Sequence, residues 1–252
     1  MMAGKPSRAV TALSLLGLLA FWTLAAWLSA DASVLPGPVE VAGVIAREAA
    51  SGKLWFHMGW TLWRVVWAFA LAMGIGCALG LVLGLSPRLN TWADPWVTVM
   101  LNLPALVIIV LCYLWIGLNE VAAITAVALN KTAMVTVTIR EGVRALDKGV
   151  ADMAQVYRMG LWARLRHVIW PQLGPFVAAS TRNGLAVIWK IVLVVEFLGR
   201  GNGVGFQIHL YFQLFDTATV LAYALSFTAV MLLIEYLIVQ RWERQASAWR
   251  TA

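Results

Sequence analysis

The chain has 252 residues, of which 62% are hydrophobic and only 12% are charged, and its mean hydropathy is +0.80. A soluble domain of this length carries about twice that share of charged residues. The net charge of +7 does not indicate nucleic-acid binding, because the basic residues gather between apolar runs, as expected for a membrane protein. The composition therefore predicts one all-α membrane domain over residues 1–252.

Six apolar runs predict six membrane-spanning helices. The first run is longer than the 7–15 residues of a signal-peptide core, and it is long enough to cross a bilayer, which takes about 20 residues. We therefore expect a retained first span, although Ala30-Asp31-Ala32 also fits a signal-peptide cleavage site. The six predicted spans are residues 10–30, 60–85, 95–116, 121–139, 175–198 and 217–239.

The segments between the spans have their own signals. Residues 39–56 follow the helix-breaking Leu35-Pro36-Gly37-Pro38 and predict an amphipathic helix at the outer membrane surface. Pro104 predicts a kink in the third span. Residues 199–216 begin with a glycine-rich stretch, and they predict an outer loop rather than a phosphate cradle, because no Gly-Lys-Ser/Thr follows.

Three glycines in the second span predict a close helix contact. Gly76, Gly80 and Gly84 recur at every fourth residue, which places them on one helix face. Small side chains let another helix approach closely. The contact is either with a helix of this chain or with a second copy across a dimer.

Polar residues inside the fourth and fifth spans are candidates for a solute pathway. Lys131, beside Asn130, falls in the middle of the fourth span, where a lysine costs roughly 2.5–3.5 kcal/mol against lipid. Lys190 and Glu196 lie in the fifth span, and six residues separate them, which is too far for a direct pair along one helix. The two lysines either contact a small anion or pair with acids such as Glu196 and Glu235.

The segment 140–172 differs from the apolar chain around it. Its basic residues are Arg140, Arg144, Lys148, Arg158, Arg164 and Arg166. Apolar residues recur at helical spacing, at Val150, Met153, Tyr157, Leu161, Leu165 and Val168. This pattern predicts a pair of amphipathic helices on the cytoplasmic side that bind a partner protein.

The same segment resembles the "EAA" loop of binding-protein-dependent ABC importer permeases. Asp152-Met153-Ala154, Gly160 and Trp170-Pro171 match the acid-Ala-Ala, glycine and hydrophobic-Pro elements of that loop. Leu35–Pro38 and the run from Trp189 through Glu196 to Gly199 are also similar to the family's patterns. The resemblance covers roughly residues 30–245, and the nitrate/sulfonate/taurine-type branch fits best.

Three positions depart from the family pattern. Asp152 replaces a glutamate, Arg158 stands at the usual glycine, and Lys131 is charged where the branch is normally uncharged. The resemblance implies the fold of type I ABC importer permeases. It also implies that Asp152 serves in docking and in stabilising a helix N-terminus. Met153, Ala154 and Tyr157 would form an apolar plug, and Gly160 would let the chain turn between the two short helices. Arg158 is a further candidate for coupling to the ATPase.

The resemblance also implies partners. They are two copies of an ABC ATPase, a periplasmic or lipid-anchored substrate-binding protein, and a second permease copy within the lipid membrane. No motif for catalysis, metal binding or nucleotide binding is present, so we expect a non-enzymatic chain without cofactors, whose partner ATPase uses ATP and Mg. The expected location is the bacterial inner membrane, with both termini cytoplasmic. A gradient-driven secondary carrier and a non-transport membrane assembly protein remain alternatives.

Overall fold

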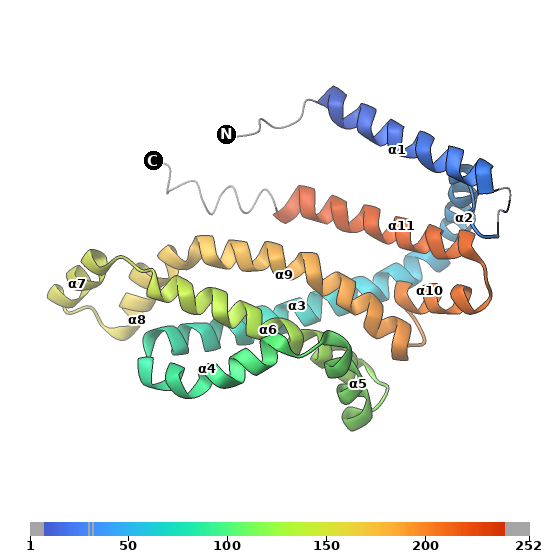
Figure 1. The fold of residues 1–252 in the computed structure, drawn as a ribbon. Coiled ribbons are helices and arrows are strands. Elements are labelled where there is room, and N and C mark those ends of the chain that lie inside the picture. The colour runs from blue at the N-terminus through green and yellow to red at the C-terminus, as the bar shows by residue number, and fades with distance from the viewer. Residues whose placement is uncertain (1–7, 30, 32, 240–252) are drawn as a thin grey trace.

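Three long helices form the centre of the molecule. The computed structural model describes residues 8–29, 31 and 33–239, and the regular structure in those ranges is helical. The central helices are α3 (Lys53–Leu85), α6 (Glu120–Arg144) and α9 (Trp170–Gly199), and α6 packs against both others. Figure 1 shows them running lengthwise, with α7 (Lys148–Val156) at one end and α10 (Val204–Gln213) at the other. These are called the α7 end and the α10 end below.

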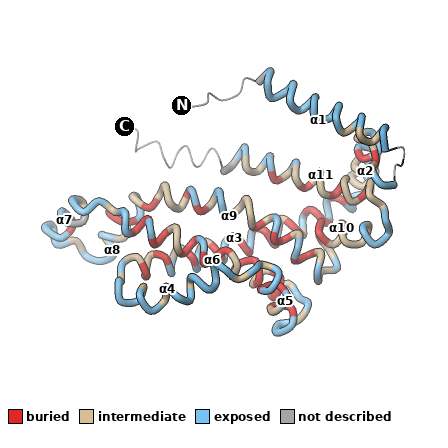
Figure 2. The backbone as a smooth tube through the Cα atoms, in the orientation of Figure 1, coloured by how far each residue is buried: buried red, intermediate tan, exposed pale blue. Residues whose placement is uncertain are grey.

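The core lies where the central helices meet. Burial follows the contact lines between helices in Figure 2, whereas the outward faces are exposed apolar surface. A buried cluster joins α3, α5, α6 and α9 and contains many alanines, including Ala68, Ala72, Ala122, Ala123 and Ala126. Such small side chains let helix backbones approach closely in a membrane protein, where outward apolar residues face hydrocarbon.

The predicted third span is two helices rather than one kinked helix. α4 (Pro87–Asn102) and α5 (Ala105–Ile116) meet at an angle of 98°. α4 begins with Pro87 in its first turn, and Ser86 Oγ accepts a hydrogen bond from Leu89 N. α4 ends before Pro104, because a proline disfavours helical backbone in the preceding residue. The break at Pro104 was predicted, but the turn is much sharper than a kink.

The predicted surface helix and second span also have different bounds. α2 (Pro38–Ala50) ends earlier than predicted, and α3 already begins at Lys53. Gly52 separates them with a φ of 80°, a left-handed conformation that glycine adopts readily. Trp55 and Phe56 therefore belong to the first turns of α3 rather than to the surface helix.

The first and last described helices lie toward one side of the body. α1 (Arg8–Ser29) has no buried residue from Ala9 to Ser29 and stands apart in Figure 1, where it meets α2 near its end. Trp22 Nε1 donates a hydrogen bond to Pro36 O at 3.1 Å and fixes that end. α11 (Thr217–Ile234) continues into the π-helical turn η2 (Glu235–Val239).

The segment 140–172 contains less helix than the predicted pair. α7 is followed by the single turn α8 (Leu161–Arg164), and the π-helical turn η1 (Leu165–Ile169) leads directly into α9. Among the described helices, α1, α3, α6 and the α11 segment are long and apolar enough to cross a membrane. The bent pair α4–α5 would make five. α9 has 30 residues but is not among these, and it carries Arg182, Lys190 and Glu196.

Candidate functional site

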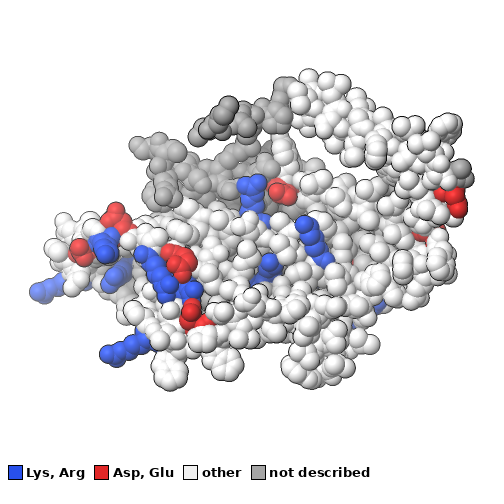
Figure 3. All heavy atoms as spheres, in the orientation of Figure 1, with Lys and Arg blue, Asp and Glu red and all other residues white. Residues whose placement is uncertain are grey.

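One side of the α6–α9 pair carries polar side chains in an otherwise apolar zone. Four residues form this polar face: Lys131, Thr138, Asn183 and Lys190. Asn130 precedes Lys131 on α6 and is half-buried. Lys131, Thr138 and Asn183 line one small cavity between the two helices, and Lys190 follows Asn183 two turns later on the same stripe of α9. Figure 3 shows isolated basic side chains in a largely uncharged central band. Because charge against lipid is costly, this face is expected to meet protein or water.

The two lysines of the polar face have different surroundings. Lys131 lies between α6 and α9 and is only 7% exposed, with Nζ at 3.6 Å from Sδ of Met134. Lys190 is exposed and lies over the neighbouring Trp189 ring, with Nζ at 5.5 Å from the ring centroid. Within the described residues, neither lysine has a carboxylate at ion-pair distance.

Glu196 lies away from the polar face, in a buried ionic cluster near the α10 end. The cluster consists of Arg64, Glu120, Glu196 and Arg200. Arg64 Nη1 lies 2.6 Å from Glu196 Oε1, and Arg64 Nε lies 2.7 Å from Glu120 Oε2. Arg200 pairs with the other oxygen of Glu120. Two cations and two carboxylates thus neutralise one another and connect α3, α6 and α9.

The ionic cluster also fixes the glycine-rich loop between α9 and α10. Thr61 Oγ1 and the backbone N–H of Gly205 donate hydrogen bonds to Glu196 Oε2, at 2.9 and 2.8 Å. Gly203 N donates to His57 Nδ1 at 3.1 Å. Gly203 has a φ of 108° and its Cα faces the Glu196 carboxylate, so a side chain there would be strained and would clash. The loop is therefore anchored to the buried structure through Gly203, whereas Gly201 is exposed.

The three predicted packing glycines contact α6 of the same chain. A Cβ at Gly76 would lie 2.6 Å from Val135 Cβ, and one at Gly80 would lie 2.6 Å from Thr136 O. A Cβ at Gly84 would lie 2.5 Å from Val143 Cβ. Of the two alternatives that the sequence leaves open, the structure shows the contact within the subunit.

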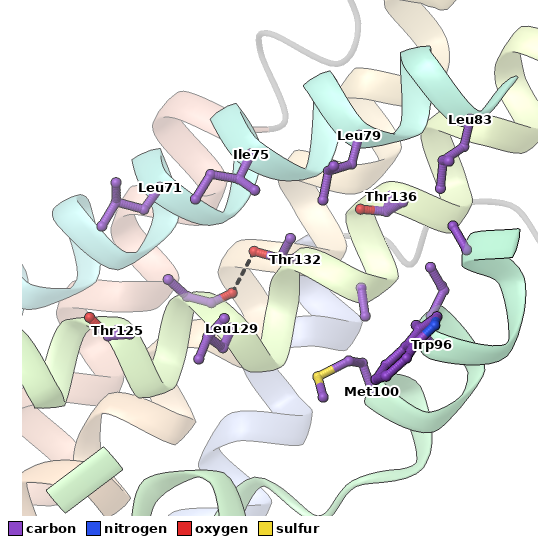
Figure 4. A pocket seen from close by; sticks show the side chains of 14 residues that line it. Leu71, Ile75, Leu79, Leu83, Trp96, Met100, Thr125, Leu129, Thr132 and Thr136 are labelled. Atoms are coloured by element: carbon purple, nitrogen blue, oxygen red, sulfur yellow. Dashed lines mark hydrogen bonds between the residues drawn. The ribbon is translucent and has the colours of Figure 1, made fainter. Parts of the chain in front are cut away.

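An apolar groove lies on the other side of α6. Its volume is about 480 Å³, and α3, α4 and α6 line it with residues that include Leu71, Leu79, Trp96, Met100 and Thr132. Figure 4 shows these side chains converging, and Thr132 Oγ1 turns back to donate to Ala128 O at 2.8 Å. This groove offers a polar solute few hydrogen bonds, in contrast to the polar face.

The helix N-terminus in the segment 140–172 is capped by Asp147 rather than by Asp152. Asp147 Oδ1 accepts hydrogen bonds from Gly149 N at 2.7 Å and from Val150 N at 3.3 Å. Asp152 lies within α7, with an exposed side chain. The role of stabilising this helix N-terminus, which we expected for Asp152, therefore belongs to Asp147.

The turn after α7 depends on Arg158 rather than on Gly160. Arg158 has a φ of 49°, in the left-handed region, and its N–H donates to Gln155 O while Met159 N–H donates to Ala154 O. These two bonds form a Schellman motif, in which glycine is the usual left-handed residue. Gly160 has ordinary extended backbone and precedes α8. Arg158 thus occupies, in conformation as well as in position, the place of the glycine in the pattern.

The α7–α8 segment, residues 147–164, exposes large apolar side chains at the α7 end. Tyr157 and Trp162 are each 75% exposed. Val156, Leu161 and Met153 are exposed beside them, whereas Ala154 is buried. Of the predicted plug, Met153 and Tyr157 therefore point outward and Ala154 points inward.

Sequence reasoning missed two sets of charged residues. Arg64, Glu120 and Arg200 form most of the ionic cluster, and Arg140 Nη1 pairs with Asp94 Oδ1 at 2.5 Å between α6 and α4. Arg64 falls within the predicted second span, residues 60–85. Its position in a long apolar helix was a signal for a buried partner, because an unpaired arginine there is costly.

The fold defines a class of protein: a helical membrane-spanning subunit built as in type I ABC importers. The structure is similar to that of the MetNI methionine ABC transporter in an inward-facing conformation. The match has a TM-score of 0.69 and 14% identity, and it covers 79% of this chain and 98% of that chain. An amino acid ABC transporter with histidines matches with a TM-score of 0.57 and 23% identity, over 73% of this chain and 91% of that one.

Residues 70–242 match the family model described as the inner membrane component of binding-protein-dependent transport systems, and the chain belongs to this family. A relative from Escherichia coli (strain K12), named as an aliphatic sulfonates transport permease protein, is 35% identical, covering 75% of this chain and 73% of the relative. A riboflavin transport system permease protein from Chloroflexus aurantiacus is 31% identical, over 95% of this chain and 89% of the relative. A bicarbonate transport system permease protein from Synechococcus elongatus is 24% identical, over 90% of this chain and 86% of the relative.

The chain is therefore the non-catalytic permease subunit of an ATP-driven importer, a multi-pass protein of the inner membrane. ATP is hydrolysed by a separate ATPase subunit, and the family works with a substrate-binding protein. This assignment excludes the secondary-carrier and assembly-protein alternatives.

Proposed function

We propose that two copies of this chain enclose the pathway of an importer for a small anion, such as a sulfonate, nitrate or a taurine-like compound. The observation that carries the proposal is the polar face, where two lysines lie at membrane depth without a carboxylate partner in the described residues. The relatives are named for sulfonates, riboflavin and bicarbonate, so family membership alone leaves the solute open.

A second copy would cover the polar face. Lys190 and Asn183 are exposed on α9, and contact of such side chains with lipid is energetically costly. The glycines of α3 are already engaged with α6 inside the subunit, so they are not available for this contact. Two polar faces opposed across a twofold axis would enclose a hydrated pathway, as homodimeric permeases require.

The pathway would favour anions because its side chains mainly donate hydrogen bonds. Lys131 and Lys190 supply positive charge, and the amide groups of Asn130 and Asn183 supply neutral donors. Glu196 was also predicted as a pathway residue, because it is a charged residue inside the fifth span. Its carboxylate is 0% exposed and bound to Arg64, which supports a structural role at the α10 end instead.

The α7–α8 segment would dock onto the ATPase, with two ATPase copies serving the two permeases. Exposed Tyr157 and Trp162, together with Asp152 and Arg158, offer an apolar contact with a charged rim. This would place the α7 end in the cytoplasm. In Figure 1 α1 starts and α11 ends toward that same side, which supports cytoplasmic termini. A periplasmic or lipid-anchored binding protein would then deliver solute at the α10 end.

Transport would be driven by movement of the ATPase pair that is passed on to the permease helices. Closure of the ATPase pair, which uses ATP and Mg, would move the α7–α8 segment as a rigid lever, because η1 joins it to α9 without a break. The subunits would then alternate between inward-facing and outward-facing states. The ionic cluster would keep α3, α6 and α9 together at the α10 end during this movement.

The test is uptake by proteoliposomes that contain the chain, its ATPase and its binding protein. We expect ATP-dependent uptake of radiolabelled taurine or methanesulfonate, and no uptake when ATP is replaced by ADP. Riboflavin serves as the comparison, because a relative is named for it. Uptake of riboflavin without uptake of either sulfonate would overturn the anion assignment and leave the importer itself standing.

A further inference from the structure

We propose that Lys131, Ser180 and Asn183 form an oxyanion-binding subsite between α6 and α9, which holds one oxygen of the transported anion. The inference rests on the proposed anion importer and assigns the residues that would select the solute class within the membrane. Ser180 and Asn183 lie one turn apart on α9, and both line the same small cavity as Lys131.

The first observation is that Lys131 is buried with few hydrogen-bond acceptors around it. Its side chain is more than nine-tenths buried, and the contact of Nζ with the Met134 thioether is 3.6 Å long. An ammonium group has three hydrogens to donate, whereas a thioether sulfur is a weak acceptor. A buried cation requires a counter-charge or several acceptors, and the described chain supplies neither here.

The second observation is independent and concerns Ser180. Its Oγ is buried and has no hydrogen-bond partner among the described residues. A serine inside a helix commonly bonds the carbonyl oxygen four residues earlier, as Thr132 and Thr138 do on α6. Ser180 does not use this option, so its hydroxyl remains available in the cavity it shares with Lys131.

The hydrogen-bond donors of Lys131, Ser180 and Asn183 favour a ligand that accepts hydrogen bonds. Lysine offers only donors, and the serine hydroxyl and the asparagine amide each offer donors as well. No acidic residue of the described part of the chain lines the cavity. Hydrogen bonds between charged donors and oxyanions are about twice as strong as neutral ones, so a sulfonate, nitrate or carboxylate oxygen would satisfy the group best.

The size of the cavity determines how such a ligand would bind. Its volume is about 10 Å³, which is at the lower limit for one water molecule. A whole sulfonate does not fit, but a single oxygen does. The rest of the anion would lie outside the cavity on the polar face, toward exposed Asn183 and Lys190.

A direct binding experiment on the full-length chain tests this without the ATPase. The protein in phosphatidylcholine nanodiscs is titrated with methanesulfonate and, separately, with dimethyl sulfone, at constant ionic strength. Dimethyl sulfone is a neutral isostere of methanesulfonate, so it controls for nonspecific solvent effects. Binding is followed as the rise in thermal unfolding temperature with ligand concentration.

We expect methanesulfonate alone to stabilise the wild-type protein. Lys131→Met and Ser180→Ala should each weaken its apparent affinity by at least about tenfold, whereas Lys131→Arg should retain part of it. Lys53→Met, which removes an exposed cation at the start of α3, is the matched control and should bind as the wild type does.

The stability of Lys131→Met without ligand separates a binding role from a structural one. If the lysine serves a ligand, its removal relieves a buried charge and the ligand-free unfolding temperature rises or stays the same. An unchanged methanesulfonate affinity in both Lys131→Met and Ser180→Ala, or no response of the wild type, would overturn the subsite. ATP-driven uptake by the complex would still report on the importer separately.

Discussion

Arg64 Nη1 lies 2.6 Å from Glu196 Oε1, and the two side chains are 1% and 0% exposed. These residues belong to α3 and α9, and 132 positions separate them in the sequence. A buried ion pair costs desolvation energy that only good geometry and further hydrogen bonds can offset. Glu120, Asn202 and Thr61 provide those bonds here.

Removing one member of the pair should be strongly destabilising. Arg64→Met would leave the Glu196 carboxylate buried without its counter-charge, and we expect a loss of about 3–5 kcal/mol in the free energy of unfolding. The measurement is thermal or denaturant unfolding in detergent. Arg88→Met is the control, because Arg88 is an exposed arginine in the first turn of α4, and its loss should have little effect.

A double variant makes this prediction sharper. Arg64→Met combined with Glu196→Gln removes both charges, so it should lose less stability than the sum of the two single variants. Additive losses would show that the two side chains do not interact in the folded protein.

Close packing of α3 against α6 gives a second prediction. Gly80→Ala would place a methyl group 2.6 Å from Thr136 O and 3.1 Å from Arg140 N, and these backbone atoms can move only if α6 moves. We expect a loss of about 1–3 kcal/mol, seen as a lower unfolding temperature.

Gly74→Ala in the same helix is its matched control. A Cβ at Gly74 would meet no atom within 4 Å, so alanine there should be neutral or stabilising by up to about 1 kcal/mol through its higher helix propensity. Equal effects at the two positions would contradict the packing explanation for Gly80.

The apolar runs indicated the long helices α1, α3, α6, α9 and α11, because hydrophobic length is a local property of the sequence, but they did not give the bounds of α2 and α3 or the separation of α4 from α5. The ionic cluster was not predictable in the same way, since Arg64 and Glu196 are joined only by the fold. Pro104 indicated a break in the third span, but its 98° angle depends on how α5 packs against α6 and α9. The four-residue spacing of the α3 glycines predicted a contact face, and only the structure identified α6 as the neighbour.

Backbone strain after α7 gives a third prediction. Arg158 adopts the left-handed conformation of a Schellman motif, where a side chain carries a steric cost that glycine avoids. Arg158→Gly should therefore stabilise the α7–α8 segment by about 0.5–1 kcal/mol, after allowance for the greater freedom of glycine in the unfolded chain.

Local hydrogen exchange in α7 is the suitable measurement, because the effect is small and confined to one segment. Gly160→Ala provides the comparison. Gly160 has ordinary backbone angles and no atom near its Cβ position, so that variant should leave exchange in α7 unchanged. Faster exchange in Arg158→Gly would mean that the arginine side chain contributes more than its backbone costs.

The exposed aromatic residues of the α7–α8 segment give the last prediction. Tyr157 and Trp162 are each 75% exposed, and large aromatic side chains of this kind often dominate binding energy at protein interfaces. Replacing both with alanine should reduce co-purification of the ATPase by at least about tenfold, while the unfolding temperature of the isolated chain stays near that of the wild type. Phe212→Ala at the α10 end removes an aromatic residue of comparable exposure and should retain the ATPase. If the double variant retains the ATPase as well as the wild type does, docking must use another surface of the α7 end, and the cytoplasmic assignment of that end would lose its main support.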